Sequence, residues 1–372
     1  MKNHWRTMMA CLVGLLAVSC SDEPVPSSLP CAEGQIERLK RNRFGKIAAS
    51  QRALADSLPC TVDLQLDKKD LELLNQLEKY LERQLPDPKN EWARCGSIDS
   101  LLSLYTLMQQ FPRCSLDQLT DYLSLSSIEG EDSSSCVLYT GYFTPLLNAA
   151  KKKDSIFKVP IYSRNTQFTY TDTSGNDSTG YAVVAFLRNH FDRYQLFLQG
   201  SSKIKWQDGG TDYLVYEGNN NHSFLNLYKL LSQINLQDSL PGKMTDQRVY
   251  YEKNKWTLDS IWQRDSFLAF YSLSSHQVKT SSGIRPIAMR TVAADKKIYP
   301  IGTLLLGEVP VLDPRGHLIR HDYQLLYVID VGGYIRGPDR LDLYFGEGKR
   351  ALIASQLLSH YGRIWVIRSN VL

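Results

Sequence analysis

A change in hydrophobic pattern at about residue 137 constrains the fold of this chain more than any other feature. Beyond it come short apolar runs such as "YAVVAFLRN", "YQLFLQGSSKIKW" and "DYLVYEG", broken by Gly, Asn and Asp. Such runs, bounded by turn residues, are typical of strands, and many short strands favour barrels over a parallel sheet. We therefore expect a mainly β region, whose helices lie in "HSFLNLYKLLSQI", "MTDQRVYYEKN" and "GEGKRALIASQLLSHYG".

The region 35–136 has a different pattern, which predicts helices. In "LDKKDLELLNQLEKYLERQLP" the leucines follow a 3.6-residue period from Leu73 onward, and Pro86 ends the segment. The segments "SIDSLLSLYTLMQQFP" and "SLDQLTDYLSLS" repeat the pattern, with Ser115 as the N-cap of the second. We find no chemistry here and interpret the region as a helical scaffold.

The N-terminus carries a targeting signal. Lys2 and Arg6 precede the apolar run "MMACLVGLLAV", which is too short for a confident membrane span and leads into "AVSC". This pattern is typical of a lipoprotein signal, 1–19, with Cys20 as the lipid-modified residue; an ordinary signal peptide cut nearby is the alternative. A polar, proline-rich tether, 20–34, follows. A lipid on Cys20 would anchor the protein to a membrane without spanning it.

Charge and cysteine content exclude several classes of function. Without 1–19 the formal charge falls from +4 to +2, and no basic run suggests nucleic acid as a partner. No pair of cysteines has zinc-ligand spacing, and His317 and His321 lie in a turn entering a strand, so we expect no metal and no cofactor. One or two disulfides, with the pairing open, are expected among five cysteines: Cys31, Cys60, Cys95, Cys114 and Cys136.

Two acids near the C-terminus are candidates for chemistry. Asp330 ends the apolar run "LLYVI", where a carboxylate needs hydrogen-bond donors, and the N–H groups of Gly332 and Gly333 are available to it or to a ligand. Asp342 alternates with leucines in "LDLYF", as a solvated strand position would. Residue chemistry alone therefore favours Asp330 and leaves the role of both acids open.

Several motifs together resemble the membrane-bound lytic transglycosylase A family. They are "YTGYFTPLL" (139–147), "LQGSSKIKWQDGG" (198–210), "YEGNNNHSF" (216–224), "SSGIRPIAMRTVAADKKIYPIGTLLL", "VIDVGGYIRGPDRLDLYFGEG" and "HYGRIWVI". The last three resemble the family's three-aspartate (3D) domain, whose aspartates would be Asp295, Asp330 and Asp342. The likeness runs from about residue 100 to 372, and the leucine-rich helices before it match poorly.

The resemblance implies a fold and a set of site residues. The fold would be a double-psi β-barrel, 137–147 plus 265–372, with a smaller β-barrel inserted at 148–264 and the glycan strand in a groove between them. Asp342 would be the catalytic acid/base and Asp330 the aspartate that shapes its site. Residues expected to bind substrate are Thr140, Gly141, Tyr142, Gly200, Ser201, Asn220, Gly332 and Gly333. Phe143, "GSSKI" and "NNNHSF" depart from the family pattern, which affects the glycan subsites.

The implied substrate is peptidoglycan, cut between N-acetylmuramic acid and N-acetylglucosamine. The muramoyl 6-hydroxyl would be the nucleophile, so that a 1,6-anhydro product forms, no water is consumed and one acid suffices. The protein would be lipid-anchored to the outer membrane, on its periplasmic or outward face. The alternatives are a hydrolase that uses Asp342 with Asp330 or Glu347 and a water, and a non-catalytic glycan-binding barrel.

Overall fold

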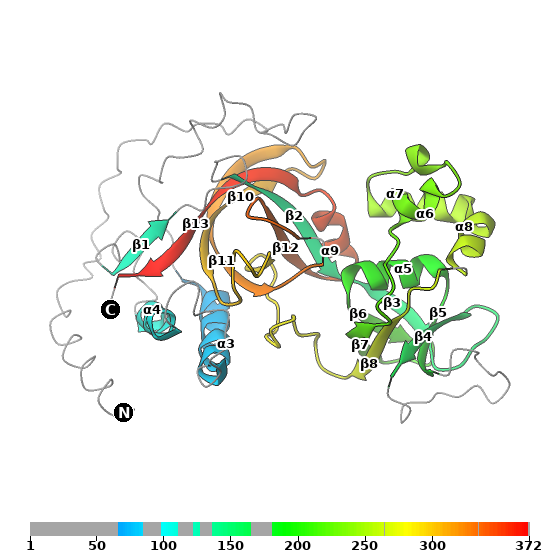
Figure 1. The fold of residues 1–372 in the computed structure, drawn as a ribbon, viewed down its shortest axis with the longest axis horizontal. Helices are drawn as coiled ribbons and strands as arrows, with labels where there is room; N and C mark the ends of the chain where they lie inside the picture. Colours follow the sequence, from blue (N-terminus) through cyan, green and yellow to red (C-terminus); the bar gives the residue numbers. More distant parts are fainter. Residues whose placement is uncertain are drawn as a thin grey trace.

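The structure is a computed structural model that describes residues 66–84, 98–110, 122–126, 136–164, 181–263, 265–333 and 335–370. The expected lipid site Cys20, the tether and the expected N-cap Ser115 lie outside these residues. Four of the five cysteines expected to form disulfides, Cys31, Cys60, Cys95 and Cys114, also lie outside them. The described chain forms two β lobes, with two N-terminal helices against the first lobe (Figure 1).

The first lobe is a six-stranded barrel in the order β13-β10-β11-β9-β12-β2, closed by pairing of β2 with β13. Its strands are β2 (Cys136–Thr144), β9 (Thr291–Ala293), β10 (Leu304–Leu312), β11 (Leu318–Asp330), β12 (Arg340–Glu347) and β13 (Ser359–Ser369). The pairs β11–β9 and β12–β2 are parallel and the others are antiparallel, which is consistent with the expected double-psi topology. Helix α9 (Gly348–Ser355) connects β12 to β13.

The second lobe is a closed barrel in the order β3-β5-β4-β8-β7-β6. Its strands are β3 (Leu146–Ala150), β4 (Val159–Ser163), β5 (Ala182–Leu187), β6 (Ser202–Trp206), β7 (Thr211–Asn219) and β8 (Ala269–Ser274). Its helices are α5 (His190–Gln199), α6 (Leu227–Ser232), η3 (Gln237–Ser239), α7 (Met244–Lys253) and α8 (Lys255–Trp262). The strands span more than the predicted insert 148–264, because a short apolar run does not indicate which barrel it joins. The expectation of a mainly β protein with two barrels is confirmed.

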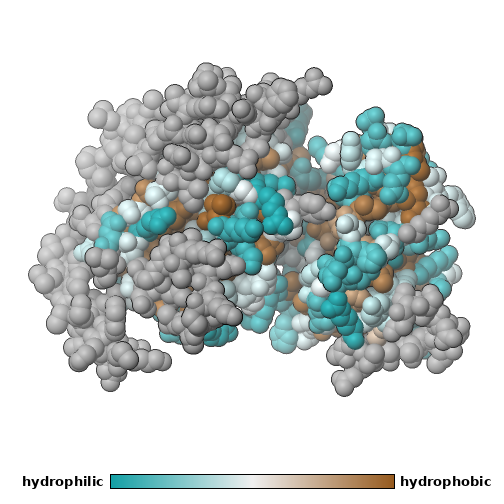
Figure 2. Space-filling view, viewed as in Figure 1, coloured by the Kyte–Doolittle hydropathy of each residue, from teal (hydrophilic) through white to brown (hydrophobic). Residues whose placement is uncertain are grey.

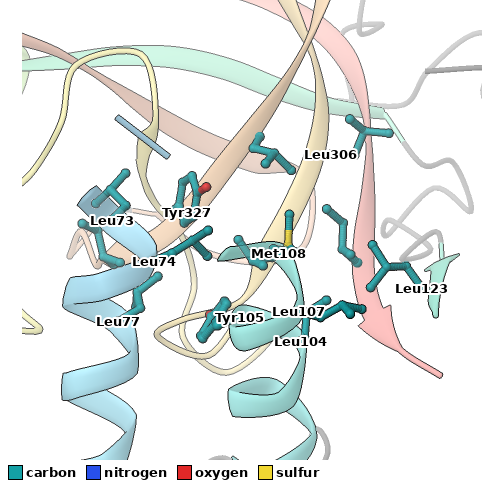
Figure 3. Close-up of a cluster of buried hydrophobic side chains, with 14 of the residues drawn as sticks. Leu73, Leu74, Leu77, Leu104, Tyr105, Leu107, Met108, Leu123, Leu306 and Tyr327 are labelled. Atoms are coloured by element: carbon teal, nitrogen blue, oxygen red, sulfur yellow. The ribbon is translucent and has the colours of Figure 1, made fainter. Parts of the chain in front are cut away.

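Two helices, α3 (Lys68–Gln84) and α4 (Ile98–Gln110), cover the outside of the first barrel. Figure 3 shows their leucines against β10 and β11. Alternate residues of β10 therefore serve two cores: Leu304 and Leu306 face the helices, whereas Leu305 lies in the other core. This double burial explains the continuous apolar run, because such a strand has no solvated face. Each fully buried leucine contributes about 2 kcal/mol of transfer free energy.

Two sequence-based predictions of secondary structure are wrong. The run "YQLFLQGSSKIKW" was expected to be one strand, but its first half belongs to α5, which Asn189 caps by accepting a hydrogen bond from the Asp192 N–H and Gly200 ends at φ 83°. Phe191, Tyr194 and Leu196 are buried on this helix. The expected helix "SLDQLTDYLSLS" ends in strand β1 (Leu123–Ser126), since its last residues pair with β13.

The exposed surface in the view of Figure 2 is largely hydrophilic, with apolar patches on the second lobe. No helix within the described ranges combines the length and the apolar character needed to cross a membrane. The described residues also contain no cluster of three His, Cys, Asp or Glu side chains arranged to hold a metal ion.

Candidate active site

The first barrel places the two candidate acids in one row across its wall. Asp330 on β11 is opposite Ala293 on β9, Ala293 is opposite Asp342 on β12, and Asp342 is opposite Thr140 on β2. The acids are thus two strands apart, a backbone separation of about 10 Å. Strand β2, far from β9, β11 and β12 in the sequence, therefore joins them at one site, which no local pattern indicates.

Asp342 lies on the outer face of this wall. Its neighbours Leu341 and Leu343 are fully buried in the hydrophobic core, so the alternation of the strand turns Asp342 the other way. The hydroxyl of Thr140 donates a hydrogen bond to Asp342 Oδ1. Arg340 Nε lies 3.2 Å from the same oxygen. The Asp342 side chain keeps 18% of its exposure, so it is accessible but firmly oriented.

Asp330 is the more enclosed of the two acids. Oδ1 accepts hydrogen bonds from the backbone N–H groups of Ser281 (3.1 Å) and Val331 (2.9 Å), and Oδ2 accepts one from the Tyr142 hydroxyl (3.1 Å). Burial raises the pKa of Asp330, and these donors oppose the rise without cancelling it. The donors to Asp330 among the described residues come from Ser281, Val331 and Tyr142, and not from the two glycines.

Tyr142 connects the two acids. It lies two residues after Thr140 on β2, its ring packs against Tyr344 with centroids 5.1 Å apart, and its hydroxyl reaches Asp330. Burial, together with the nearby charge of Asp330, raises the pKa of Tyr142 well above its ordinary value. The phenol therefore stays protonated at neutral pH and acts as a hydrogen-bond donor. One strand, β2, supplies partners to both Asp342 and Asp330.

Asp295 is the third of the aspartates expected from the resemblance to the 3D domain, and it holds two loops together. Its carboxylate accepts hydrogen bonds from the N–H groups of Lys297 and Gly337, both at 3.0 Å. Burial alone would raise its pKa, but these bonds and the charges of Arg336 and Lys297 outweigh burial and hold the pKa of Asp295 below its usual value. The chain leaving β9 is thereby fixed to the chain entering β12, which carries Asp342.

Two glycines of the motifs lie in close contact with neighbouring groups. A Cβ on Gly141 would lie 2.6 Å from the Ser355 carbonyl oxygen, where α9 packs on β2. A Cβ on Gly332 would lie 2.6 Å from Ile335 Cδ1 in the turn after β11. The exposed Gly333 meets nothing within 4 Å. Packing against backbone therefore accounts for Gly141, whereas Gly332 faces the end of a side chain that can move.

The remaining predicted site residues lie on the second barrel. Gly200 ends α5, and Ser201 Oγ accepts a hydrogen bond from the Tyr216 N–H at 3.0 Å. Asn220 joins its loop to the chain entering β8: Nδ2 donates to the Ser266 carbonyl and Oδ1 accepts from the Leu268 N–H. Within the part of the chain that the structure describes, no hydrogen bond joins Gly200, Ser201 or Asn220 to Asp330 or Asp342.

Direct contacts join the two barrels beside the site. Glu347, at the end of β12, forms an ion pair with Lys203 of β6 (3.3 Å) and accepts a hydrogen bond from Tyr213 of β7 (3.1 Å). The Phe143 N–H donates to Gln199 Oε1 at 3.2 Å. Sequence reasoning did not assign a site role to Arg340, Ser281 or Tyr344. Arg340 and Tyr344 had a usable signal, because each is two residues from Asp342 on β12 and residues two apart on a strand share a face.

Comparison with known sequences shows which class of protein this arrangement represents. The model of the 3D domain matches residues 290–368, and the model of the MltA specific insert domain matches residues 172–272. The chain is thus a 3D-domain protein with an MltA-specific insert. A Vibrio cholerae serotype O1 protein named membrane-bound lytic murein transglycosylase A is 30% identical over 252 residues, covering 65% of this chain and 68% of that protein. The Escherichia coli K12 protein of the same name is 29% identical with the same coverage.

The chain belongs to the membrane-bound lytic murein transglycosylase A family, which is a family of enzymes. Solved structures share its fold. E. coli MltA with bound chitohexaose superposes with a TM-score of 0.64 at 22% identity, covering 84% of this chain and 93% of that one. MltA from Neisseria gonorrhoeae gives a TM-score of 0.59 at 12% identity, covering 81% and 89%. The expected family is confirmed.

Proposed function

We propose that this chain is a peptidoglycan lytic transglycosylase, which breaks the β-1,4 bond between N-acetylmuramic acid and N-acetylglucosamine without water. Family membership supports this proposal, since the matching relatives are named lytic murein transglycosylases. The observation that carries it at the site is Asp342, an accessible carboxyl on a barrel wall, oriented by the Thr140 hydroxyl. E. coli MltA binds chitohexaose, a carbohydrate chain, which supports a glycan ligand here.

In the proposed mechanism, one carboxyl serves as acid and then as base. Protonated Asp342 gives its proton to the glycosidic oxygen as the bond to the muramoyl C1 breaks. The resulting carboxylate takes the proton of the muramoyl 6-hydroxyl as that oxygen bonds to C1. The products are a 1,6-anhydromuramoyl end and a free sugar hydroxyl, and the enzyme regains its proton. Because the nucleophile belongs to the substrate, the step has the advantage of an intramolecular reaction.

Asp330 positions this site in the proposal. Its carboxyl holds the Tyr142 hydroxyl at 3.1 Å, and Tyr142 follows Thr140 by two residues on the same face of β2. Loss of the Asp330 contact would free the Tyr142 side chain beside the threonine that orients Asp342. The glycan would also contact Thr140, Gly141, Tyr142, Gly332 and Gly333 of the first barrel, and Gly200, Ser201 and Asn220 of the second.

A hydrolase would need a second carboxylate that activates water. Asp330 accepts three hydrogen bonds through its two oxygens, and Glu347 is held by Lys203 and Tyr213. Both carboxylates are thus committed to protein groups, which supports the single-acid mechanism. In glycosidases that use two carboxyl groups, the distance between them predicts the stereochemical outcome. The proposed mechanism uses one acid, so this rule does not apply to it.

The proposed location is the cell envelope, with a lipid on Cys20 holding the enzyme at the outer membrane. The relatives' names describe membrane-bound proteins, which supports membrane association. Metabolic labelling with a fatty-acid analogue tests the anchor: wild type should incorporate the label, and Cys20→Ala should not. Labelling of both proteins would exclude Cys20 as the lipid site.

Digestion of purified peptidoglycan tests the proposed reaction. Wild type should release fragments with 1,6-anhydromuramoyl ends, which mass spectrometry distinguishes from free reducing ends by one water. Asp342→Asn, which keeps the side-chain shape, should bind peptidoglycan as wild type does and release no fragments. Free reducing ends from wild type would establish a hydrolase. Binding without cleavage by wild type would establish a glycan-binding barrel.

A further inference from the structure

We propose that Arg340 binds a carboxylate of the peptidoglycan substrate and leaves Asp342 when it does so. This inference rests on the proposed function and adds a recognition site to it. The contact that Arg340 now makes, the charges around it and the chemistry of the substrate each support it.

Arg340 is held by only part of its guanidinium. It is two residues before Asp342 on β12, so both side chains lie on the outer face of the barrel wall. Arg340 Nε is 3.2 Å from Asp342 Oδ1, and the two side chains are 38% and 18% exposed. Among the described residues, no group accepts a hydrogen bond from the two terminal nitrogens of Arg340. The part of the guanidinium that binds carboxylates bidentately is therefore available.

The present contact opposes the proposed chemistry. The hydrogen bond from Arg340 to Asp342 has full charge assistance only while the Asp342 side chain is a carboxylate. The reaction begins from the protonated acid, because the leaving oxygen needs its proton. The contact with Arg340 must therefore weaken in the reactive complex, whereas that with Thr140 need not, since a hydroxyl can bond to either form of the acid. A substrate anion beside Arg340 would weaken it at the moment of binding.

The surroundings of Arg340 favour such an anion. Asp295 ties together the loops that carry Lys297 and Arg336, and both of these side chains are exposed. The acids of the same loops, Asp295 and Asp339, are 8% and 9% exposed. Lys296 is also exposed, so the basic residues of these loops outnumber the acids and the outward charge of the loops is positive. Such a surface attracts carboxylates by direct electrostatic complementarity.

Peptidoglycan offers carboxylates from two sources close to the cleaved bond. In strands without peptides, the lactyl group of each muramoyl residue ends in a carboxylate. In intact strands this group is an amide, and the stem peptide supplies carboxylates instead. The shared chemistry is a carboxylate attached to the muramoyl residue. Chitohexaose, built only of N-acetylglucosamine, has neither and serves as the neutral probe.

Binding measurements with the whole chain test the proposal. Dissociation constants of wild type, Arg340→Gln and Arg340→Lys are compared for chitohexaose, peptide-free glycan strands and stem-bearing strands, at a temperature at which cleavage is negligible. Arg320→Gln is the matched control, because Arg320 also forms an ion pair with an aspartate two residues later on its strand (Asp322, 2.7 Å). We expect Arg340→Gln to weaken binding of carboxylate-bearing strands by about 10-fold and to leave chitohexaose binding and the control unchanged. Arg340→Lys should recover part of the loss.

The outcomes separate the possibilities. Loss confined to peptide-free strands identifies the lactyl carboxylate, loss confined to stem-bearing strands identifies the peptide, and loss for both supports both sources. Equal affinities for wild type and Arg340→Gln on every ligand would overturn the proposal. An equal loss for chitohexaose would also overturn it, because Arg340 would then act through the general shape of the site. Failure of wild type to cleave peptidoglycan would refute the proposed function while leaving the binding comparison interpretable.

Discussion

Thr140 and Asp342 lie directly opposite each other on the parallel strands β2 and β12, and the threonine hydroxyl donates a hydrogen bond to the carboxylate. The two residues are 202 positions apart in the sequence, and the whole second barrel lies between their strands in the chain. Closure of the first barrel therefore assembles the site. Because β-ladder hydrogen bonds fix the register, the carboxyl group has little freedom to turn away.

Removal of the Thr140 hydroxyl is expected to slow cleavage without unfolding the protein. Thr140→Val keeps the shape of the side chain and loses one charge-assisted hydrogen bond, worth about 1.5–3 kcal/mol. The initial rate of anhydromuropeptide release should fall by about 10-fold or more. Thr140→Ser, which retains the hydroxyl, should stay close to wild type. A valine variant as active as wild type would show that the contact does not orient the acid.

Asp330→Asn is expected to separate activity from stability. The pKa of Asp330 is raised in the folded protein. In the pH range between the unfolded pKa, about 3.9, and this raised folded pKa, the folded protein therefore binds more protons than the unfolded protein. The stability of wild type therefore falls as pH rises through this window, because the buried carboxyl must ionise. Asparagine removes that cost and keeps an oxygen for the Ser281 and Val331 N–H groups.

Urea unfolding at pH 3 and pH 7 checks this prediction. Relative to wild type, Asp330→Asn should gain stability at pH 7, and the gain should shrink as pH falls from the raised folded pKa to the unfolded value, about 3.9, so that little of it is left at pH 3. Peptidoglycan cleavage should fall at every pH, since Tyr142 loses its anionic partner. A variant that is less stable than wild type at pH 7 would show that hydrogen bonds to the carboxylate outweigh the cost of its burial.

Gly141→Ala is expected to damage both stability and activity. The added Cβ would approach the Ser355 carbonyl oxygen to 2.6 Å and Phe345 Cε2 to 2.9 Å, and a backbone contact cannot move aside cheaply. Overpacking of this kind costs about 1–3 kcal/mol, and the displaced strand carries Thr140 and Tyr142. Thermal unfolding and cleavage rates measure both effects. Gly242→Ala is the control, because its Cβ would meet nothing within 4 Å; equal effects of the two variants would contradict the packing argument.

The strands could be predicted from the sequence where burial produces a repeated hydrophobic pattern. The run containing Leu304, Leu305 and Leu306 is apolar on both faces because helices cover one and the other lies in a second core. The alternation of Leu341, Asp342 and Leu343 could also be recognised in the sequence, but it indicates only that the Asp342 side chain points away from the hydrophobic core. Whether such a side chain meets solvent or a functional partner depends on the strand across from it.

The site could be predicted from the sequence only where the residues that carry the family resemblance lie close together in the chain. Asp342 and Asp330 came from one block, whereas Ser281 approaches Asp330 through its backbone N–H, which no residue type reveals. The sequence does not mark the beginning of α5, because its cap, Asn189, closely follows the apolar run of β5 and equally fits the end of that strand. The partners of Glu347 lie on another barrel, and their contact depends on how the two barrels pack.

Glu347→Gln is expected to loosen the junction between the barrels without abolishing catalysis. The half-buried ion pair with Lys203 is lost, at a cost of up to about 1 kcal/mol, while glutamine can still accept the hydrogen bond from Tyr213.

The hydrogen bond with Tyr213 and the charge of Glu347 raise the pKa of Lys203, and burial opposes the rise. A raised lysine pKa stabilises the fold fully below the unfolded value, about 10.4, so the contribution of Lys203 should be present at neutral pH. We expect weaker binding of long glycan strands, with a turnover rate within a few-fold of wild type. Asp208→Asn, which removes an exposed ion pair with Lys151 on the second barrel alone, is the matched control and should change neither. Loss of turnover as complete as in Asp342→Asn would instead identify Glu347 as a second catalytic carboxylate and return the enzyme to the hydrolase class.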